Sequence, residues 1–130
     1  MNTVIPFRWL SDAIDTLLAG DSDAWTQFYS DDAVHEFPYA PEAFPGRLEG
    51  KAAIGEYMKH LPEMVKFASF DDVRVHEAGK DLLIVELQGR GRLVADGAPF
   101  HMSYVWFITF RDGLVSHFRD YMNPLELPPM

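Results

Sequence analysis

Hydrophobic positions along this chain follow two different periods, one in each half. In the first half they recur every three or four residues, which is typical of the buried face of a helix. Such runs cover residues 9–18, the aromatic positions between residues 25 and 29, and residues 51–64. Gly20 supplies a stop for the first run, and Asp21 or Ser22 can cap the second. The first half therefore predicts about three helices.

In the second half, and in one short run before it, hydrophobic positions alternate or form β-branched and aromatic stretches, as in strands. These stretches are residues 33–37, 67–77, 82–95, 99–110 and 114–122. Turn sequences such as Asp96-Gly97 separate the long ones, and prolines and glycines make residues 39–50 an irregular loop. Helices followed by a meander of strands predict an α+β fold, with the helices covering one face of an antiparallel sheet.

Alternation also assigns the side chains of each strand to one of two faces. In residues 99–110, the more apolar face carries Phe100, Met102, Tyr104, Trp106 and Ile108. In the last strand, one face carries Ser116, Phe118, Asp120 and Met122, and the other carries His117, Arg119 and Tyr121. If the apolar sets form the inner face beneath the helices, Asp120 is the lone carboxylate on it.

Asp120 is therefore the first candidate for catalysis. Burial disfavours the charged form of a carboxyl group, and a carboxyl group in an apolar pocket can act as a general acid or base near neutral pH. Two alternatives stay open at this point. Asp120 can lie solvated at the strand end or pair with Arg119 or Arg47. A one-residue bulge would instead turn His117 and Arg119 inward.

His35 is the second candidate for catalysis. It shares a strand face with Phe37, which would place its imidazole at the mouth of the pocket, although a lone histidine in a strand can also be purely structural. Tyr57, Tyr104 and Trp106 can each offer an O–H or N–H group to a ligand. The residues predicted to line the pocket are Phe37, Tyr57, Met58, Leu61, Met102, Tyr104, Trp106 and Phe118.

The composition narrows the function further. A chain of 130 residues without a linker predicts one domain over residues 1–130, and an aromatic share of 14% suits an aromatic-lined cavity. A net charge of −9 disfavours nucleic acid and membrane partners. Cysteine is absent, the histidines lack metal-ligand spacing, and no nucleotide-binding motif occurs, so we expect no cofactor and no metal. The first ten residues do not read as a signal peptide, and we expect a cytoplasmic protein.

The order of several short sequence runs resembles the SnoaL-like polyketide cyclase and ketosteroid isomerase branch of the nuclear transport factor 2-like superfamily. These runs are AGD at 19–21, FYSDDA at 28–33, GKAAI at 50–54 and FRDGLV at 110–115. The ending FRDYMNP at 118–124 is most similar to the phenazine-biosynthesis A/B subgroup, where an acid occupies the place of Asp120. The resemblance implies an open cone around an apolar cavity, no cofactor, and a homodimer formed through the outer face of the sheet.

Departures from the family pattern exclude two of its activities. By this resemblance, the catalytic base of ketosteroid isomerases falls at Phe37 and the two oxyanion donors at Ala13 and Trp106, and none of these side chains can perform that proton chemistry. Epoxide hydrolases of the family need an Arg-x-Asp sequence where this chain has Arg90-Gly91-Arg92. The acid at Asp120 is retained in both comparisons.

Two functional hypotheses follow. In the first, the chain is an isomerase- or cyclase-type enzyme for a small apolar cyclic or carbonyl-bearing metabolite. Asp120 then moves a proton, and His35 or Tyr104 binds the carbonyl or enolate oxygen. In the second, the chain is a ligand-binding or dimerisation module without chemistry.

Overall fold

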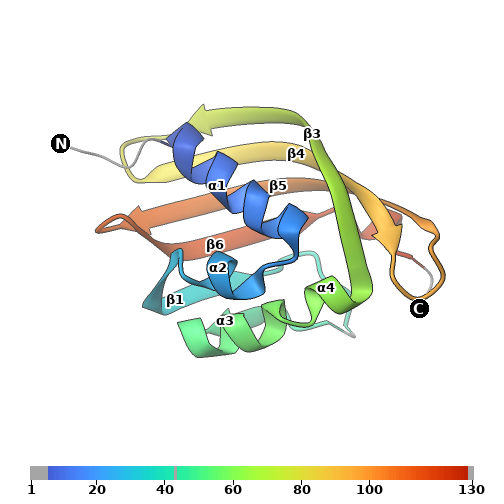
Figure 1. Ribbon diagram of the computed structural model, residues 1–130. Helices are drawn as coiled ribbons and strands as arrows, with labels where there is room; N and C mark the ends of the chain where they lie inside the picture. Colours follow the sequence, from blue (N-terminus) through green and yellow to red (C-terminus); the bar gives the residue numbers. More distant parts are fainter. Residues whose placement is uncertain (1–5, 43, 129–130) are drawn as a thin grey trace.

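Six strands form one curved sheet, and helices cover its inner face (Figure 1). The computed structural model describes residues 6–42 and 44–128. In chain order the elements are α1 (Pro6–Ala19), α2 (Ser22–Thr26), β1 (Tyr29–Glu36), β2 (Arg47–Glu49), α3 (Lys51–Met58), α4 (Leu61–Met64), β3 (Val65–Glu77), β4 (Leu82–Leu93), β5 (Pro99–Arg111), β6 (Leu114–Met122) and the 3-10 helix η1 (Pro124–Glu126). This arrangement confirms the predicted α+β fold. Residues 1–5, on which the prediction of no signal peptide partly depends, lie outside the described residues.

The sheet is mixed, which corrects the prediction of a wholly antiparallel sheet. Its strand order is β2-β1-β6-β5-β4-β3, and β1 runs parallel to β6 whereas every other neighbouring pair is antiparallel. A parallel pair needs a long connection. The chain between β1 and β6 supplies it, because that stretch contains two helices and the three other long strands.

The largest differences from the predicted elements concern three segments. α2 ends at Thr26, so Tyr29, expected on this helix, is instead the first residue of β1. The helix predicted over residues 51–64 is broken into α3 and α4, and Pro62 lacks the N–H group that a continuous helix would require there. The loop predicted over residues 39–50 contains β2, which pairs with β1.

A β-bulge near the β5–β6 turn determines which side chains of β6 face the helices. The register shifts after Thr109 and leaves Ser116 as the extra residue, whose Oγ donates to the Thr109 carbonyl at 3.2 Å. Ser116 thus leaves the alternation in which it was predicted to share a face with Phe118. From Phe118 onward the pairing is regular, so Asp120 follows Phe118 on the inner face and lies opposite Trp106.

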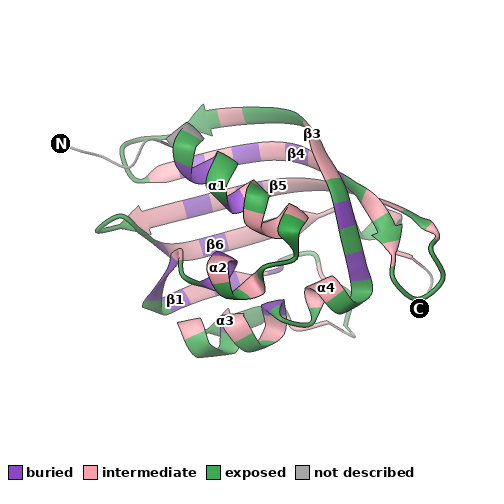
Figure 2. Ribbon diagram, in the orientation of Figure 1, coloured by how far each residue is buried: buried purple, intermediate pink, exposed green. Residues whose placement is uncertain are grey.

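The core lies between this inner face and the helices, where the buried residues of Figure 2 gather. Trp25 of α2 is near its centre. The Trp25 ring centroid lies 5.9 Å from that of Phe118 and 6.1 Å from those of Tyr29 and Trp106, in the tilted and edge-to-face geometries that aromatic pairs favour. Within residues 6–42 and 44–128, no helix is both long and apolar enough to cross a membrane.

Candidate functional site

A cavity of about 90 Å³ lies inside the cone, between the helices and the inner face of the sheet. Its wall is mostly apolar and aromatic. Nine of the residues proposed from the sequence line it, namely His35, Phe37, Tyr57, Met58, Leu61, Tyr104, Trp106, Phe118 and Asp120. Five further residues line the cavity but were not predicted to do so, namely Leu17, Trp25, Phe67, Phe70 and Met122.

Met102 was predicted to line the pocket, but it does not. It is buried on β5 opposite Gly89, outside the cavity wall. The absence of a side chain at Gly89 lets the Tyr104 ring lean over this position, where a Cβ atom would lie only 3.0 Å from the ring. The rings of Tyr104, Phe67 and Phe70, all of which line the cavity, therefore fill the space above Gly89 beside Met102.

Asp120 is the only carboxylate among the described residues that line the cavity, and it extends from β6 into the wall. Its side chain is 14% exposed, and its Oδ1 is buried with no hydrogen-bond partner among the described residues. Arg47 pairs with Glu36 and Glu49 instead, and Arg119 lies over the Phe107 ring on the outer face. The structure therefore does not show the ion pair with Arg47 or Arg119 that the sequence left open.

His35 lies deeper than the pocket mouth at which it was predicted. It is 2% exposed, because its imidazole is held between the rings of Phe37 and Phe118, with centroids at 4.6 and 4.5 Å. Nδ1 lies 2.8 Å from the Tyr29 hydroxyl. Nε2 lies 3.8 Å from Asp120 Oδ2, too far for a hydrogen bond, and has no partner among the described residues.

Three tyrosine hydroxyls near Asp120 have a raised pKa. Burial raises the pKa of the Tyr29 and Tyr104 hydroxyls well above the usual value, and the negative charge of Asp120 raises it further. The same two causes raise the pKa of Tyr57. All three hydroxyls therefore keep their protons at neutral pH, and those of Tyr57 and Tyr104, which line the cavity, can donate hydrogen bonds.

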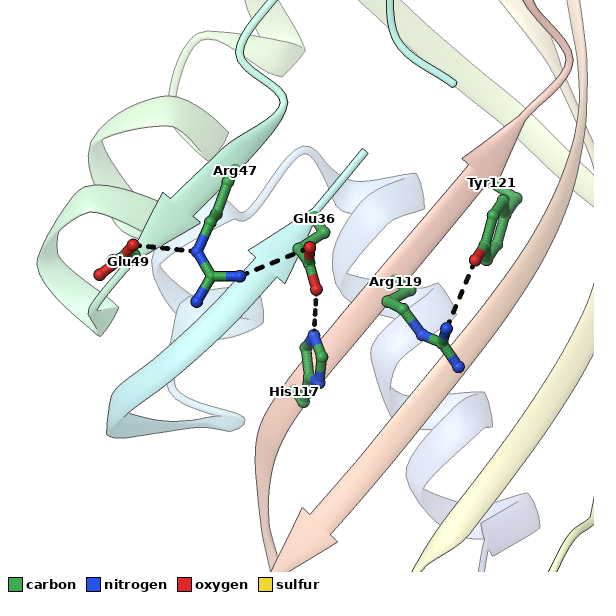
Figure 3. A network of polar contacts seen from close by, with 6 residues as sticks. All are labelled: Glu36, Arg47, Glu49, His117, Arg119 and Tyr121. Atoms are coloured by element: carbon green, nitrogen blue, oxygen red, sulfur yellow. Dashed lines mark hydrogen bonds and ion pairs between the residues drawn. The ribbon is translucent and has the colours of Figure 1, made fainter. Parts of the chain in front are cut away.

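The outer face of the sheet carries a separate polar network (Figure 3). His117 Nε2 bonds Glu36, which also pairs with Arg47 of β2. Arg119 donates to the Tyr121 hydroxyl at 3.4 Å. His117 and Arg119 thus point away from the cavity, and the bulge at Ser116 lies too early in β6 to turn them inward. Among residues 6–42 and 44–128, no group of three His, Asp or Glu side chains is arranged to hold a metal ion.

Tyr29 is the polar residue near the site that the sequence analysis missed. It was assigned to a helix because the spacing from Trp25 to Tyr29 fits one helical turn. Alternation back from His35 would not have recovered it, because Asp31 at the intervening odd position is exposed and the pairing of β1 with β6 shifts register between Tyr29 and Val34. No local sequence signal therefore marks Tyr29 as a neighbour of the site.

Comparison with known proteins decides the family. The sequence profile of the SnoaL-like domain matches residues 10–118. The chain belongs to the SnoaL-like family. This SnoaL-like chain is 42% identical over 110 residues to the uncharacterised protein YesE of Bacillus subtilis, covering 84% of this chain and 75% of YesE. It is 36% identical over 108 residues to the uncharacterised PhzA/B-like protein PA3332 of Pseudomonas aeruginosa, covering 82% of this chain and 76% of that protein. The resemblance to the SnoaL-like branch and its phenazine-biosynthesis A/B subgroup is therefore confirmed.

A solved structure supports the same placement of this SnoaL-like chain. The crystal structure of a proposed isomerase from Bacillus subtilis superposes with a TM-score of 0.85 at 39% identity, covering 89% of this chain and 84% of that one. The cone described above is thus the fold of a close relative as well.

Proposed function

We propose that this SnoaL-like chain is an isomerase- or cyclase-type enzyme that needs no cofactor and acts on a small apolar metabolite bearing a carbonyl group. One observation carries the proposal. His35 Nε2 and Asp120 Oδ1 are buried in residues that line one mostly apolar cavity, and neither has a partner among the described residues; the same holds for the indole Nε1 atoms of Trp25 and Trp106. Buried polar groups are normally satisfied, so a carboxylate acceptor and ring N–H donors left without partners around one cavity favour a polar ligand that satisfies them.

The geometry suggests a division of labour. The Asp120 carboxylate takes a proton from the carbon next to the ligand carbonyl, the C–H electron pair forms a carbon–carbon double bond, and the carbonyl π pair moves to oxygen. His35 Nε2 lies on the far side of a 3.8 Å gap, where its N–H group can donate to that oxygen. If the ligand is a β,γ-unsaturated ketone, Asp120 then returns the proton to the γ-carbon of the dienolate and the double bond moves into conjugation. Alternatively the enolate carbon attacks a second carbonyl carbon to close a ring, and the resulting alkoxide takes the proton back from Asp120.

The surroundings favour this chemistry over binding alone. A hydrogen-bond donor aimed at a developing enolate in a dry site lowers the barrier by about 3–4 kcal/mol in comparable oxyanion sites. Among the described residues, the lining contains no Lys or Arg, so no permanent cation lies beside the Asp120 carboxyl group in the cavity wall. The relative from Bacillus subtilis, itself a proposed isomerase, is consistent with proton transfer between carbons.

Cavity size restricts the reacting part of the substrate. An engineered protein cavity of about 150 Å³ holds benzene, whereas this cavity measures about 90 Å³. We therefore propose that a group of a few heavy atoms reacts here, and that a larger substrate either extends through the opening or displaces wall side chains.

Proton exchange into small ketones tests the proposal without knowledge of the natural substrate. Acetone and cyclopentanone in D₂O are incubated with the protein, and loss of the α-proton signal is followed by NMR. We expect exchange above the buffer rate, and Asp120→Asn to remove at least about 99% of it, because general-base catalysis contributes about 10²–10⁴-fold. Asp12→Asn, at an exposed position of α1, is the matched control and should exchange like the wild type.

The alternative function predicts a different pattern. If the wild-type protein binds the ketones, seen as shifts of the Met58 and Met122 methyl signals, yet exchanges no protons, the chain is a binding module and the enzymatic proposal is wrong. Equal exchange by wild type and Asp120→Asn would also contradict it.

A further inference from the structure

The Tyr29 hydroxyl lies behind the site rather than in it. Tyr29 is 1% exposed and does not line the cavity, but its oxygen is 2.8 Å from His35 Nδ1, the ring nitrogen that faces away from Asp120. This contact bears on the chemistry because an imidazole nitrogen either donates or accepts, and the two ring nitrogens of a neutral histidine take opposite roles.

The direction of this hydrogen bond follows from counting donors and acceptors. A tyrosine hydroxyl has one proton to donate, and burial keeps that proton on Tyr29 at neutral pH by raising its pKa. Among the described residues, His35 Nδ1 is the one acceptor in hydrogen-bond contact with this hydroxyl. If Nδ1 carried a proton and donated to Tyr29, the buried O–H would have no acceptor, at a cost comparable to a lost hydrogen bond. Tyr29 therefore donates to an unprotonated Nδ1.

We propose that Tyr29 is a positioning residue that holds His35 in the tautomer with its proton on Nε2. The imidazole then presents an N–H donor, rather than a lone pair, to the space beside Asp120. The Phe118 ring stacks on the imidazole and the tilted Phe37 ring packs beside it, so together they restrain the imidazole plane, and Tyr29 determines which ring nitrogen carries the proton. This assignment selects a ligand with a hydrogen-bond acceptor, such as a carbonyl oxygen, at Nε2. The catalytic consequence rests on the proposed function, whereas the tautomer itself does not.

Long-range ¹H–¹⁵N NMR of the uniformly ¹⁵N-labelled protein measures the tautomer directly. The His35 ring signals are assigned as those that disappear in His35→Gln. We expect Nε2 at a shift typical of a protonated nitrogen and Nδ1 at one typical of an unprotonated nitrogen. The reverse pattern in the wild-type protein would overturn the inference, whatever the protein catalyses.

Tyr29→Phe keeps the ring and removes the hydroxyl. We expect the His35 nitrogen signals to move toward a mixture of tautomers. We also expect kcat for cyclopentanone exchange to fall by about tenfold with KM changed less than about twofold, since loss of a whole oxyanion donor costs about 10²–10³-fold. Ser30→Ala is the control, because it removes the neighbouring buried hydroxyl, which bonds Asp32 and not His35. Unchanged His35 signals in Tyr29→Phe would contradict the positioning role.

The two proposals can fail separately. If the wild-type protein shows the Nε2–H tautomer but Asp120→Asn still exchanges ketone protons at the wild-type rate, the proposed function is wrong and the role of Tyr29 in setting the tautomer stands. If the tautomer is reversed while exchange depends on Asp120, the proposed function stands and the inference about Tyr29 is wrong.

Discussion

At the scale of single residues, the candidate site consists of polar atoms held rigidly in an apolar wall. His35 is stacked on Phe118 with an interplanar angle of 8°, and Asp120 follows Phe118 by two positions on the same strand face. The phenyl ring therefore packs against His35, and Asp120 follows it along the strand. Both residues line one cavity, and each carries a buried polar atom without a partner among the described residues, so a single ligand in the cavity can contact both.

The donor role of His35 can be separated from its packing role by two substitutions. In glutamine the side-chain NH₂ group occupies about the place of Nε2, so His35→Gln keeps a neutral donor, whereas His35→Leu keeps volume and loses the donor. We expect His35→Gln to retain ketone proton exchange within about tenfold of wild type, and His35→Leu to lose about 100-fold or more. Equal losses in the two variants, with thermal melts confirming that both fold, would contradict the donor role.

The placement of some of these site residues could be predicted from the sequence, and that of others could not. The orientation of Asp120 follows from the regular alternation of side chains after Phe118, so the strand pattern alone predicts the face on which Asp120 lies. The depth of His35 did not follow, because it depends on the parallel pairing of β1 with β6, a long-range contact that leaves no local pattern. Tyr29 was missed because one helical turn and the start of a strand look alike over five residues.

At the scale of elements, one polar contact ties together strands that are distant in sequence. Glu36 of β1 bonds His117 of β6 and pairs with Arg47 of β2 (Figure 3). β2 has only three residues and was predicted as loop, since no alternation can be recognised over so short a stretch. Its strand conformation depends on partners that the local sequence does not specify. The same holds for the parallel order of β1 and β6.

This contact makes stability depend on pH in a defined direction. The hydrogen bond from His117, with the nearby positive charges, lowers the pKa of Glu36 below its ordinary value of about 4.5. A lowered carboxyl pKa stabilises the fold above the unfolded value, and this stabilisation is lost as the pH falls through the folded value. We expect Glu36→Gln to lower the free energy of unfolding at pH 7 by about 1 kcal/mol or less, and the difference from wild type to shrink below pH 4.5.

Urea titrations at pH 7 and at about pH 3.5 measure this difference. Glu77→Gln, at the exposed end of β3, serves as the control and should match the wild type at both values. A deficit for Glu36→Gln that stays constant between the two pH values would show that the Glu36 charge does not stabilise the fold.

At the scale of the whole molecule, the outer face of the sheet has the composition of an interface. Arg119 lies over the Phe107 ring at 4.7 Å and near the Tyr121 ring, and the 61%-exposed Tyr39 packs edge-on against Tyr121. Beside them a groove of about 630 Å³ runs past Val105. Aromatic residues and arginine are enriched at protein–protein interfaces. We propose that two chains associate through this face.

Light scattering after size exclusion checks the association. We expect twice the chain mass of 14.8 kDa at tens of micromolar, and a shift to the monomer for Val105→Asp, which places a charge in the groove. Val94→Asp, at an exposed position beyond the end of β4, should remain dimeric. A monomeric wild-type protein at this concentration would contradict the proposal.

A crystal structure of the wild-type protein soaked in cyclopentanone shows most directly whether a carbonyl ligand binds against both His35 and Asp120. The expected result is the ketone in the cavity, with its oxygen within about 3 Å of His35 Nε2 and an α-carbon facing the Asp120 carboxylate. A cavity that stays free of ketone at saturating concentration would contradict it. So would a ketone bound with its oxygen directed away from His35.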